Sequence, residues 1–271
     1  MRALDALAGW PVPTAAGAVV DAGGVRSAAG PTGWSTRIAS VTKLLVAYAC
    51  LVAVEEGTLD LDAPAGPPGA TVRHLLAHAS GLPFTGATPI APPGRRRIYS
   101  NTGFELAGRA LADASGMSAA GYLAEAVTQP LGMAATELRG SVAKDGWSTV
   151  DDLAVFAREL LAPTLITPGT LAEATSEQFP GLAGVLPDIG TFDPNPWGLG
   201  FELKGDKAPH WTAPGGSPRT FGHFGGSGTF LWVDPDAGLA CVVLTDREFG
   251  GWAPPLWAAL SARVLAEGAA G

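Results

Sequence analysis

The sequence predicts a mixed α/β fold, in which a layer of strands built from both ends of the chain is combined with an inserted all-helical region. Strand-like runs occur near the N-terminus and again after Gly190, whereas the sequence between them has a helical period. In addition, 47% of the 271 residues are apolar and 15% are charged, so a sizeable core is expected and disorder is not.

The N-terminal part is expected to form a hairpin followed by two helices. Residues 18–20 and 25–27 are short apolar runs that flank a turn sequence at 21–24. A helix is predicted from about Ser40 to Glu56, because its apolar residues keep a helical period and Gly57 is a suitable stop. Thr71 is a good N-cap for a short helix that continues to residue 79.

Helices are predicted to fill the middle of the chain and strands its end. Ser118, Ser148 and Thr167 are candidate N-caps for three of four helices, which we place near 102–115, 119–128, 149–162 and 168–176. The later part should contain strands at 197–203, 229–233 and 239–245 and a closing helix at 256–266. We therefore expect residues 1–60 and 175–271 to form the α/β sheet region and 61–174 to form the helical region of one interleaved unit.

Charge and composition exclude several classes of partner. The formal net charge is −8, whereas nucleic acids and anionic membranes require a basic face. The longest apolar run, 44–54, is about half of the roughly 20 residues that span a bilayer. The first 13 residues lack an apolar signal segment, so a cytoplasmic location is expected. Cys50 and Cys241 are expected to be buried thiols.

Ser40 and Lys43 form the first candidate catalytic pair. Residues three apart at a helix start share a face, so the amine can meet the hydroxyl. An amine removes the serine proton only if burial and the helix end lower its pKa. The helix start also offers backbone N–H groups to an oxyanion. Taken alone, this spacing favours the simpler interpretation of a helix start with an exposed lysine.

Two further segments add to this pair. Tyr99 can relay a proton to a leaving group, and the carboxamide of Asn101 can hold a substrate carbonyl and the lysine. Residues 223–226, His-Phe-Gly-Gly, precede a predicted strand. The glycines Gly225 and Gly226 allow a substrate to lie close to the strand edge, where a backbone N–H can supply an oxyanion donor.

Taken in this order, the three segments resemble the motifs of the serine β-lactamase and penicillin-binding-protein superfamily. The chain is similar to the branch that contains class C β-lactamases, D-alanyl-D-alanine carboxypeptidases and family VIII carboxylesterases. The resemblance extends to the connecting segments 55–62, 74–83, 99–116 and 222–236. It implies a β-lactamase/transpeptidase-like fold, with an antiparallel sheet flanked by helices.

The resemblance also implies roles for the site residues. Ser40 would be the acylated nucleophile, Lys43 its proton partner and Tyr99 the proton shuttle, whereas Asn101 would orient the substrate. The N–H groups of Ser40 and Gly226 would form the oxyanion hole, and His223 would occupy the position often held by lysine. Whether Lys43 or Tyr99 acts as the base is left open, and no metal or organic cofactor is expected.

The third segment departs from the β-lactamase pattern, and this bears on the substrate. A neutral His223 and an apolar Phe224 make a poor site for a substrate carboxylate, because charge-assisted hydrogen bonds are lost. We therefore expect a small-molecule ester, with an amide, a D-amino-acid peptide or a β-lactam as alternatives.

Other classes of function receive less support from the sequence. His74 and His78 have a spacing that can hold zinc, but no glutamate follows His74 and no third ligand is evident. Residues 225–229 lack the final glycine of the Gly-x-Ser-x-Gly nucleophile turn of α/β-hydrolases. The remaining alternative is a non-catalytic binding or sensor protein with the same fold.

Overall fold

The computed structural model describes residues 2–270 and is built around a six-stranded antiparallel sheet with the strand order β2-β1-β12-β11-β10-β9. The N-terminal strands are β1 (Ala15–Asp21) and β2 (Gly24–Ala29). The C-terminal strands are β9 (Glu202–Leu203), β10 (Phe221–Gly225), β11 (Thr229–Asp234) and β12 (Leu239–Thr245). Since β1 pairs with β12, the two ends of the chain form one sheet, as predicted.

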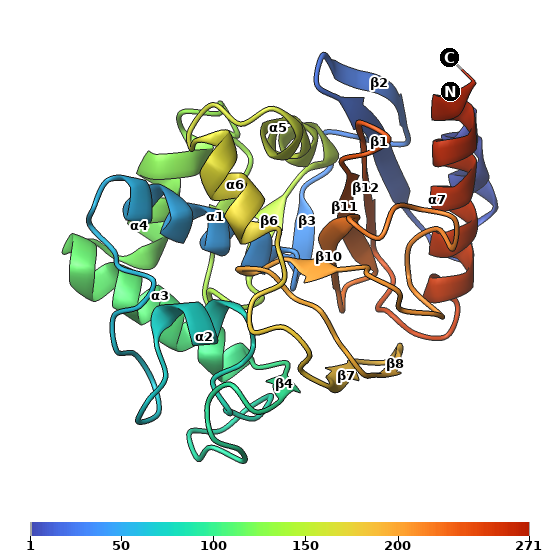
Figure 1. The fold of residues 1–271 in the computed structure, drawn as a ribbon. Coiled ribbons are helices and arrows are strands. Elements are labelled where there is room, and N and C mark those ends of the chain that lie inside the picture. The colour runs from blue at the N-terminus through green and yellow to red at the C-terminus, as the bar shows by residue number, and fades with distance from the viewer. Residues whose placement is uncertain (1, 271) are drawn as a thin grey trace.

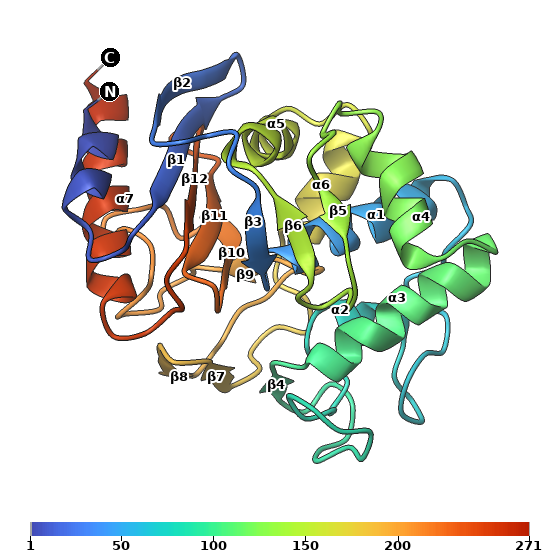
Figure 2. The same ribbon diagram turned by 180° about the vertical axis from the view of Figure 1, so that it is seen from behind.

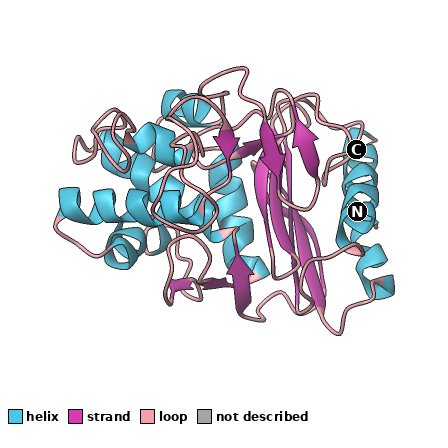
Figure 3. Ribbon diagram, turned by 90° about the horizontal axis from the view of Figure 1, so that it is seen from below, coloured by secondary structure: helices cyan, strands magenta, loops and turns pink. Residues whose placement is uncertain are grey.

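Helices cover both faces of this sheet. The closing helix α7 (Ala253–Ala269) lies on one face beside the 3₁₀ helix η1 (Ala3–Gly9), and α5 (Val150–Leu161) packs on the other face (Figure 1). Seen from below, the sheet lies between α7 and the helical half of the molecule (Figure 3). Large aromatic side chains fill the α7 side, including Trp211, Trp232 and Trp257.

The helical half is assembled around α1 (Thr42–Glu55), which is buried on all sides. Every residue of α1 from Thr42 to Ala53 is buried, which is typical of a central helix surrounded by others. Its neighbours are α3 (Asn101–Ser115), α4 (Ala119–Leu123), a π-helical turn η2 (Ala124–Thr128) and α6 (Pro168–Ala174). The short helix α2 (Val72–Leu76) packs on α3.

Two small sheets of three strands each join the large sheet to the helical half of the molecule. Strands β3 (Thr36–Ala39), β6 (Gly146–Ser148) and β5 (Glu137–Leu138) pair between the large sheet and the helices, as Figure 2 shows. Strands β4 (Arg97–Ile98), β7 (Gly184–Leu186) and β8 (Gly190–Phe192) form the other sheet, in which β4 and β7 are parallel. Strand β3 ends directly before Ser40, and strand β4 ends directly before Tyr99.

The predicted fold class is confirmed, and several element boundaries differ. Helix α1 begins at Thr42, so Ser40 lies in the turn before it. Thr71, Ser118 and Thr167 are N-caps as predicted, whereas Thr149 caps α5 in place of Ser148, which is the last residue of β6.

The predicted strand 197–203 is wrong over most of its length. Only Glu202–Leu203 is a strand, because Gly200 has a φ of 85° and turns the chain against α1. Conversely, β10 was not predicted, since glycines at 222 and 225 lower its strand propensity. Both glycines are required in the sheet. A side chain at Gly222 would collide with the Leu231 carbonyl, and one at Gly225 would collide with the Ile38 carbonyl.

The region expected to be all-helical, 61–174, also contains strands β4, β5 and β6. In addition, α5 lies within this range but packs on β1 and β12 of the large sheet. The reason is the apolar face of α5, which includes Leu153, Phe156 and Leu160 and is buried in the same core as the inner face of the sheet.

The remaining expectations about the chain concern thiols and membranes. Cys50 and Cys241 are buried free thiols, as predicted, and burial raises the pKa of both. Between residues 2 and 270, no helix combines the length and the apolar character needed to cross a bilayer.

Candidate active site

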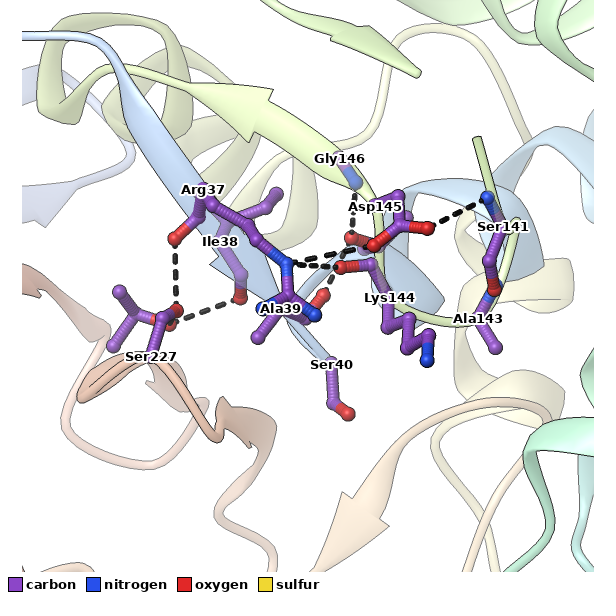
Figure 4. A network of polar contacts seen from close by, with 12 residues as sticks. Arg37, Ile38, Ala39, Ser40, Ser141, Ala143, Lys144, Asp145, Gly146 and Ser227 are labelled. Atoms are coloured by element: carbon purple, nitrogen blue, oxygen red, sulfur yellow. Dashed lines mark hydrogen bonds and ion pairs between the residues drawn. The ribbon is translucent and has the colours of Figure 1, made fainter. Parts of the chain in front are cut away.

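Ser40 is presented by a backbone segment that is fixed from two directions. The preceding residue, Ala39, has a φ of 46°, a left-handed conformation that costs energy for a residue with a Cβ atom. Hydroxyl groups of the β10–β11 turn hold this segment, since Ser227 Oγ donates to the Arg37 carbonyl at 2.8 Å and Thr229 Oγ1 to the Ile38 carbonyl at 2.9 Å. Figure 4 shows the Ser40 side chain pointing away from this network.

Lys43 projects from the first turn of α1 toward Ser40. Its Nζ lies 3.3 Å from Ser40 Oγ, 2.8 Å from Asn101 Oδ1 and 2.7 Å from the Ala143 carbonyl oxygen. The side chain is fully buried, with Nζ above the Tyr99 ring at 4.8 Å from its centroid.

Burial lowers the pKa of Lys43 well below its usual value, and the charge of Lys144 lowers it further while that of Glu105 raises it. A neutral amine has two N–H groups and one lone pair. Two carbonyl oxygens, of Asn101 and Ala143, can only accept, so they take both N–H groups. The lone pair then remains for the hydroxyl of Ser40, which is the arrangement that general-base catalysis requires.

His78 bonds the peptide groups on both sides of Tyr99. The backbone N–H before Tyr99, that of Ile98, donates to the His78 carbonyl at 2.8 Å. The N–H after it, that of Ser100, donates to His78 Nδ1 at 3.1 Å, and the imidazole lies 4.5 Å from the phenol ring. His78 itself has a φ of 54° and is buried. This residue therefore fixes the position of Tyr99 through both neighbouring peptide groups.

Burial raises the pKa of Tyr99, and the neighbouring Ser40 hydroxyl opposes this shift. A phenol with a raised pKa is neutral near pH 7, so it can pass on a proton but does not serve as a standing base. This environment favours Lys43 as the base and Tyr99 as the relay, the alternative that the sequence left open.

Asn101 is the first residue of α3, which Ser100 caps by accepting a hydrogen bond from the Gly103 N–H at 2.9 Å. The Asn101 N–H donates to the Phe84 carbonyl at 3.0 Å, and its Oδ1 accepts from Lys43. Within the described residues the Asn101 Nδ2 group has no hydrogen-bond partner, so this amide can donate to a substrate carbonyl.

His223 lies in β10, behind Tyr99. Its Nδ1–H donates to the Phe224 carbonyl at 2.6 Å, and its ring lies 5.7 Å from that of Tyr99 and 5.5 Å from that of Trp197. Burial lowers the pKa of His223 to about 3, so the imidazole is neutral near pH 7. Its Nε2 is buried and, within residues 2–270, makes no hydrogen bond.

Phe224 faces the opposite side of the sheet, where it packs on Trp211 and Trp257. The segment 223–224 therefore provides no cation to a substrate.

Gly225 and Gly226 have different surroundings. A Cβ atom at Gly225 would collide with the Ile38 carbonyl and lie 3.1 Å from Ala39 Cβ, so this glycine lets β10 approach the Ser40 segment. A Cβ atom at Gly226 would contact nothing within 4 Å. Within the described part of the chain, the N–H groups of Ser40 and Gly226 make no hydrogen bond, which leaves both for an oxyanion.

The structure brings Ser40, Lys43, Tyr99 and Asn101 into one cluster, although they come from two segments 58 residues apart. The Ala143 carbonyl was missed, because a main-chain oxygen leaves no signal in the sequence. The position of His78 beside Tyr99 was also missed, since sequence reasoning related it only to the turn that follows it.

The two histidines considered as zinc ligands have structural partners. His74 Nδ1 contacts Thr71 Oγ1 at 2.9 Å and its ring stacks on Phe179, whereas His78 holds Ser100. Over residues 2–270 no cluster of three or more potential metal ligands occurs.

Comparison with known proteins places this geometry in a family. The family described as Beta-lactamase matches residues 12–266. A solved structure of a beta-lactamase from Mycobacterium bovis is 55% identical, covers 98% of this chain and 99% of its own, and superposes with a TM-score of 0.97.

More distant structures share the fold. Simvastatin synthase from Aspergillus terreus is 19% identical, with a TM-score of 0.79 and coverage of 98% of this chain and 97% of its own. The hydrolase EstCE1, described as having promiscuous acyltransferase activity, is 16% identical, with a TM-score of 0.79 and coverage of 97% and 96%.

Among curated proteins, the D-alanyl-D-alanine-carboxypeptidase/endopeptidase AmpH of Escherichia coli is 31% identical over 134 residues. The match covers 36% of this chain, and the chain spans only 35% of the length of that relative.

Proposed function

Because this chain belongs to the beta-lactamase family of serine hydrolases, we propose that it hydrolyses a small ester through an acyl-enzyme on Ser40. The observation that carries the proposal is the hydrogen-bonding of Lys43. In the neutral amine both N–H groups are taken by Asn101 and Ala143, which leaves the lone pair for the hydroxyl of Ser40 at 3.3 Å.

The acylation step follows from these positions. Ser40 Oγ attacks the ester carbonyl carbon while its proton moves to Lys43 Nζ. The carbonyl oxygen becomes an oxyanion, which accepts hydrogen bonds from the N–H groups of Ser40 and Gly226. The bond to the alcohol oxygen then breaks, and the proton passes from Lys43 through the Tyr99 hydroxyl to the departing alcohol. The acyl group remains as an ester on Ser40.

Deacylation repeats these steps with water in place of the alcohol. Lys43 and Tyr99 remove a proton from the water, which attacks the acyl carbon, and the proton returns to Ser40 Oγ as the carboxylic acid leaves. The burial of both groups supports this exchange, because it lowers the pKa of Lys43 and raises that of Tyr99, and each shift favours the neutral form.

The third segment supports an ester substrate without a carboxylate. His223 is neutral and buried, and Phe224 points to the far side of the sheet. EstCE1 provides a parallel, because that protein is a hydrolase with the same fold.

A second candidate is an amide or peptide with a carboxylate, as in the carboxypeptidase AmpH. Lys144 favours it, because this exposed cation lies close enough to Lys43 to lower its pKa, and Figure 4 shows both Lys144 and Ser40 in the same part of the site.

The first test is hydrolysis of p-nitrophenyl butyrate by the purified protein and by the Ser40→Ala variant, with nitrocefin and a D-alanyl-D-alanine peptide as parallel substrates. We expect ester turnover that falls by at least about 10³-fold in the variant, because the nucleophile is lost. Preferred turnover of the peptide would select the second candidate. Ester turnover that survives the substitution would refute Ser40 as the nucleophile, and no acylation of Ser40 by any substrate would point to a non-catalytic binding protein.

A further inference from the structure

Exposed apolar side chains gather beside Tyr99. Five large hydrophobic residues are exposed among those described, and three of them, Phe84 (54%), Ile90 (68%) and Val185 (51%), line one cavity. Tyr99 lines the same cavity, which has a volume of about 300 Å³. Scattered apolar residues on a surface need no explanation, but three that share one cavity with a candidate catalytic residue do.

Hydrogen bonds and packing contacts fix the apolar residues of this cavity, in part through the segment that contains Tyr99 and Asn101. The Phe84 ring stacks on Tyr99 at 5.9 Å with an interplanar angle of 25°, and the Phe84 carbonyl accepts from the Asn101 N–H at 3.0 Å. Ile90 is anchored through its N–H, which donates to the Gly81 carbonyl at 2.9 Å. Val185 stands opposite Ile98 in the β4–β7 pair. These apolar side chains are therefore held in fixed positions around Tyr99.

The charge at the cavity restricts its ligand. Arg96 lines the cavity, is exposed, and makes no ion pair among the described residues. A cationic group would be repelled there, whereas an uncharged apolar group would bury surface against Phe84, Ile90 and Val185. At about 30 Å³ per non-hydrogen atom, a value taken from liquid water, the cavity has room for about ten such atoms.

We propose that this cavity binds the leaving group of the substrate, so that the substrate is an ester of an uncharged, apolar alcohol of about six to ten carbon and oxygen atoms. The inference rests on the proposed function, in which Tyr99 delivers the proton to the departing alcohol. The alcohol must then lie at the Tyr99 hydroxyl, and the cavity next to this residue receives the rest of it. Phe84, Ile90 and Val185 determine the specificity for the alcohol.

The test compares esters that differ only in the alcohol or only in the acyl group. We expect kcat/KM for hexyl butyrate to exceed that for ethyl butyrate by at least about tenfold, since four more methylene groups leave water. Ethyl octanoate, which carries the four additional carbons on the acyl side, should not show this gain over ethyl butyrate. A gain on the acyl side alone, or no gain on either side, would overturn the proposal.

Substitutions in the cavity test whether the cavity causes the preference for the longer alcohol. Val185→Asn and Ile90→Asn should each lower the hexyl-to-ethyl ratio to below about threefold. The matched control is Val25→Asn, because Val25 is a strand valine of similar exposure (57%) that does not line the cavity, and it should leave the ratio unchanged. A ratio that all three variants leave intact, or that the control lowers equally, would contradict the assignment.

Binding of the alcohol separates this proposal from the proposed function. Saturation-transfer NMR should detect 1-hexanol on the unmodified protein and on Val25→Asn, but not on Val185→Asn. If this pattern is found while no ester is hydrolysed, the cavity is confirmed as an alcohol site and the ester hydrolase assignment fails. If 1-hexanol does not bind, or binds equally to both variants, the cavity proposal is wrong whatever the enzyme hydrolyses.

Discussion

At the scale of single residues, the site depends on the protonation of two buried groups. Lys43 is fully buried and, among residues 2–270, hydrogen-bonds no carboxylate, so burial lowers its pKa well below the usual value and more distant charges shift it further. His223 is neutral near pH 7 because its burial lowers its pKa to about 3. Burial therefore favours the neutral form of the proposed base, Lys43, and leaves segment 223–226 without a cation.

Charges near Lys43 should shift the pH dependence of acylation. Lys144 lowers the pKa of Lys43, so Lys144→Met should move the acid limb of kcat/KM to higher pH. Glu105 raises this pKa, so Glu105→Gln should move the limb to lower pH. Both side chains are exposed, and both shifts should shrink in high salt. The pH profile of ester hydrolysis measures them, and shifts in the same direction would contradict Lys43 as the base.

His223 should make the protein less stable in acid. Its pKa is about 3 in the folded protein and about 6.5 in the unfolded chain, so between these values only the unfolded chain binds the proton. The free energy of unfolding should therefore fall by about 1.4 kcal/mol for each unit of pH below 6.5, from this group alone.

Denaturant unfolding at several pH values tests this expectation. The His223→Asn variant lacks the titrating group, so its stability should decline less steeply between pH 6.5 and 4. Equal slopes for the two proteins would show that His223 is protonated in the folded state.

At the scale of elements, the close approach of β10 to β3 builds the site. Gly225 allows this approach, and the hydroxyls of Ser227 and Thr229 hold the end of β3 next to Ser40. The left-handed Ala39 can persist because these hydrogen bonds fix the residues on its N-terminal side. The position of Ser40, the proposed nucleophile, is therefore determined by the packing of two strands as well as by the helix that follows.

Alanine substitutions at the two neighbouring glycines should have different effects, because Gly225 is closely packed and Gly226 is not. Gly225→Ala should lower the free energy of unfolding by roughly 2 kcal/mol or more and abolish activity, because the new methyl group meets the backbone at Ile38. Gly226→Ala, where the methyl group meets nothing within 4 Å, should change stability by no more than about 0.5 kcal/mol. Equal losses of thermal stability in the two variants would refute the close approach.

At the scale of the whole molecule, α1 and α5 connect the sheet to the helical half. Tyr48 of α1 donates from its hydroxyl to Glu159 Oε1 of α5 at 2.6 Å. The same carboxylate accepts from the N–H groups of Thr164 and Leu165, each at 2.7 Å. Since α5 also covers the large sheet, this buried network links the halves on either side of the site.

Removal of the Tyr48 hydroxyl should weaken this connection. Tyr48→Phe should lower the free energy of unfolding by about 1–3 kcal/mol, because a buried hydrogen bond to a charged group is lost. The control is Tyr122→Phe, whose hydroxyl bonds the exposed Glu56 at 2.5 Å and should contribute about 0.5 kcal/mol or less. Chemical denaturation measures both, and equal effects would mean that the buried network does not stabilise the junction.

Much of the architecture was predictable because it follows from local pattern. The helices with an apolar face and an N-cap, such as those that begin after Thr71, Ser118 and Thr167, appear where the sequence places them. The end strands β11 and β12 are also found, since they are apolar runs between turns. Strand β10 was not recognised, because its glycines are selected by contacts with β3 and β11 that a local pattern does not contain.

The sequence by itself identified the candidate side chains for the proposed chemistry, because a nucleophile, an amine, a phenol and a carboxamide are each a residue type at a recognisable spacing: Ser40, Lys43, Tyr99 and Asn101. Only the tertiary structure decided their state. The pKa of Lys43 depends on its burial, its amine is held by the Ala143 carbonyl 100 residues away, and Tyr99 lies between two peptide groups that bond His78. Desolvation and hydrogen-bond partners are properties of the packed chain, so no local pattern can specify them.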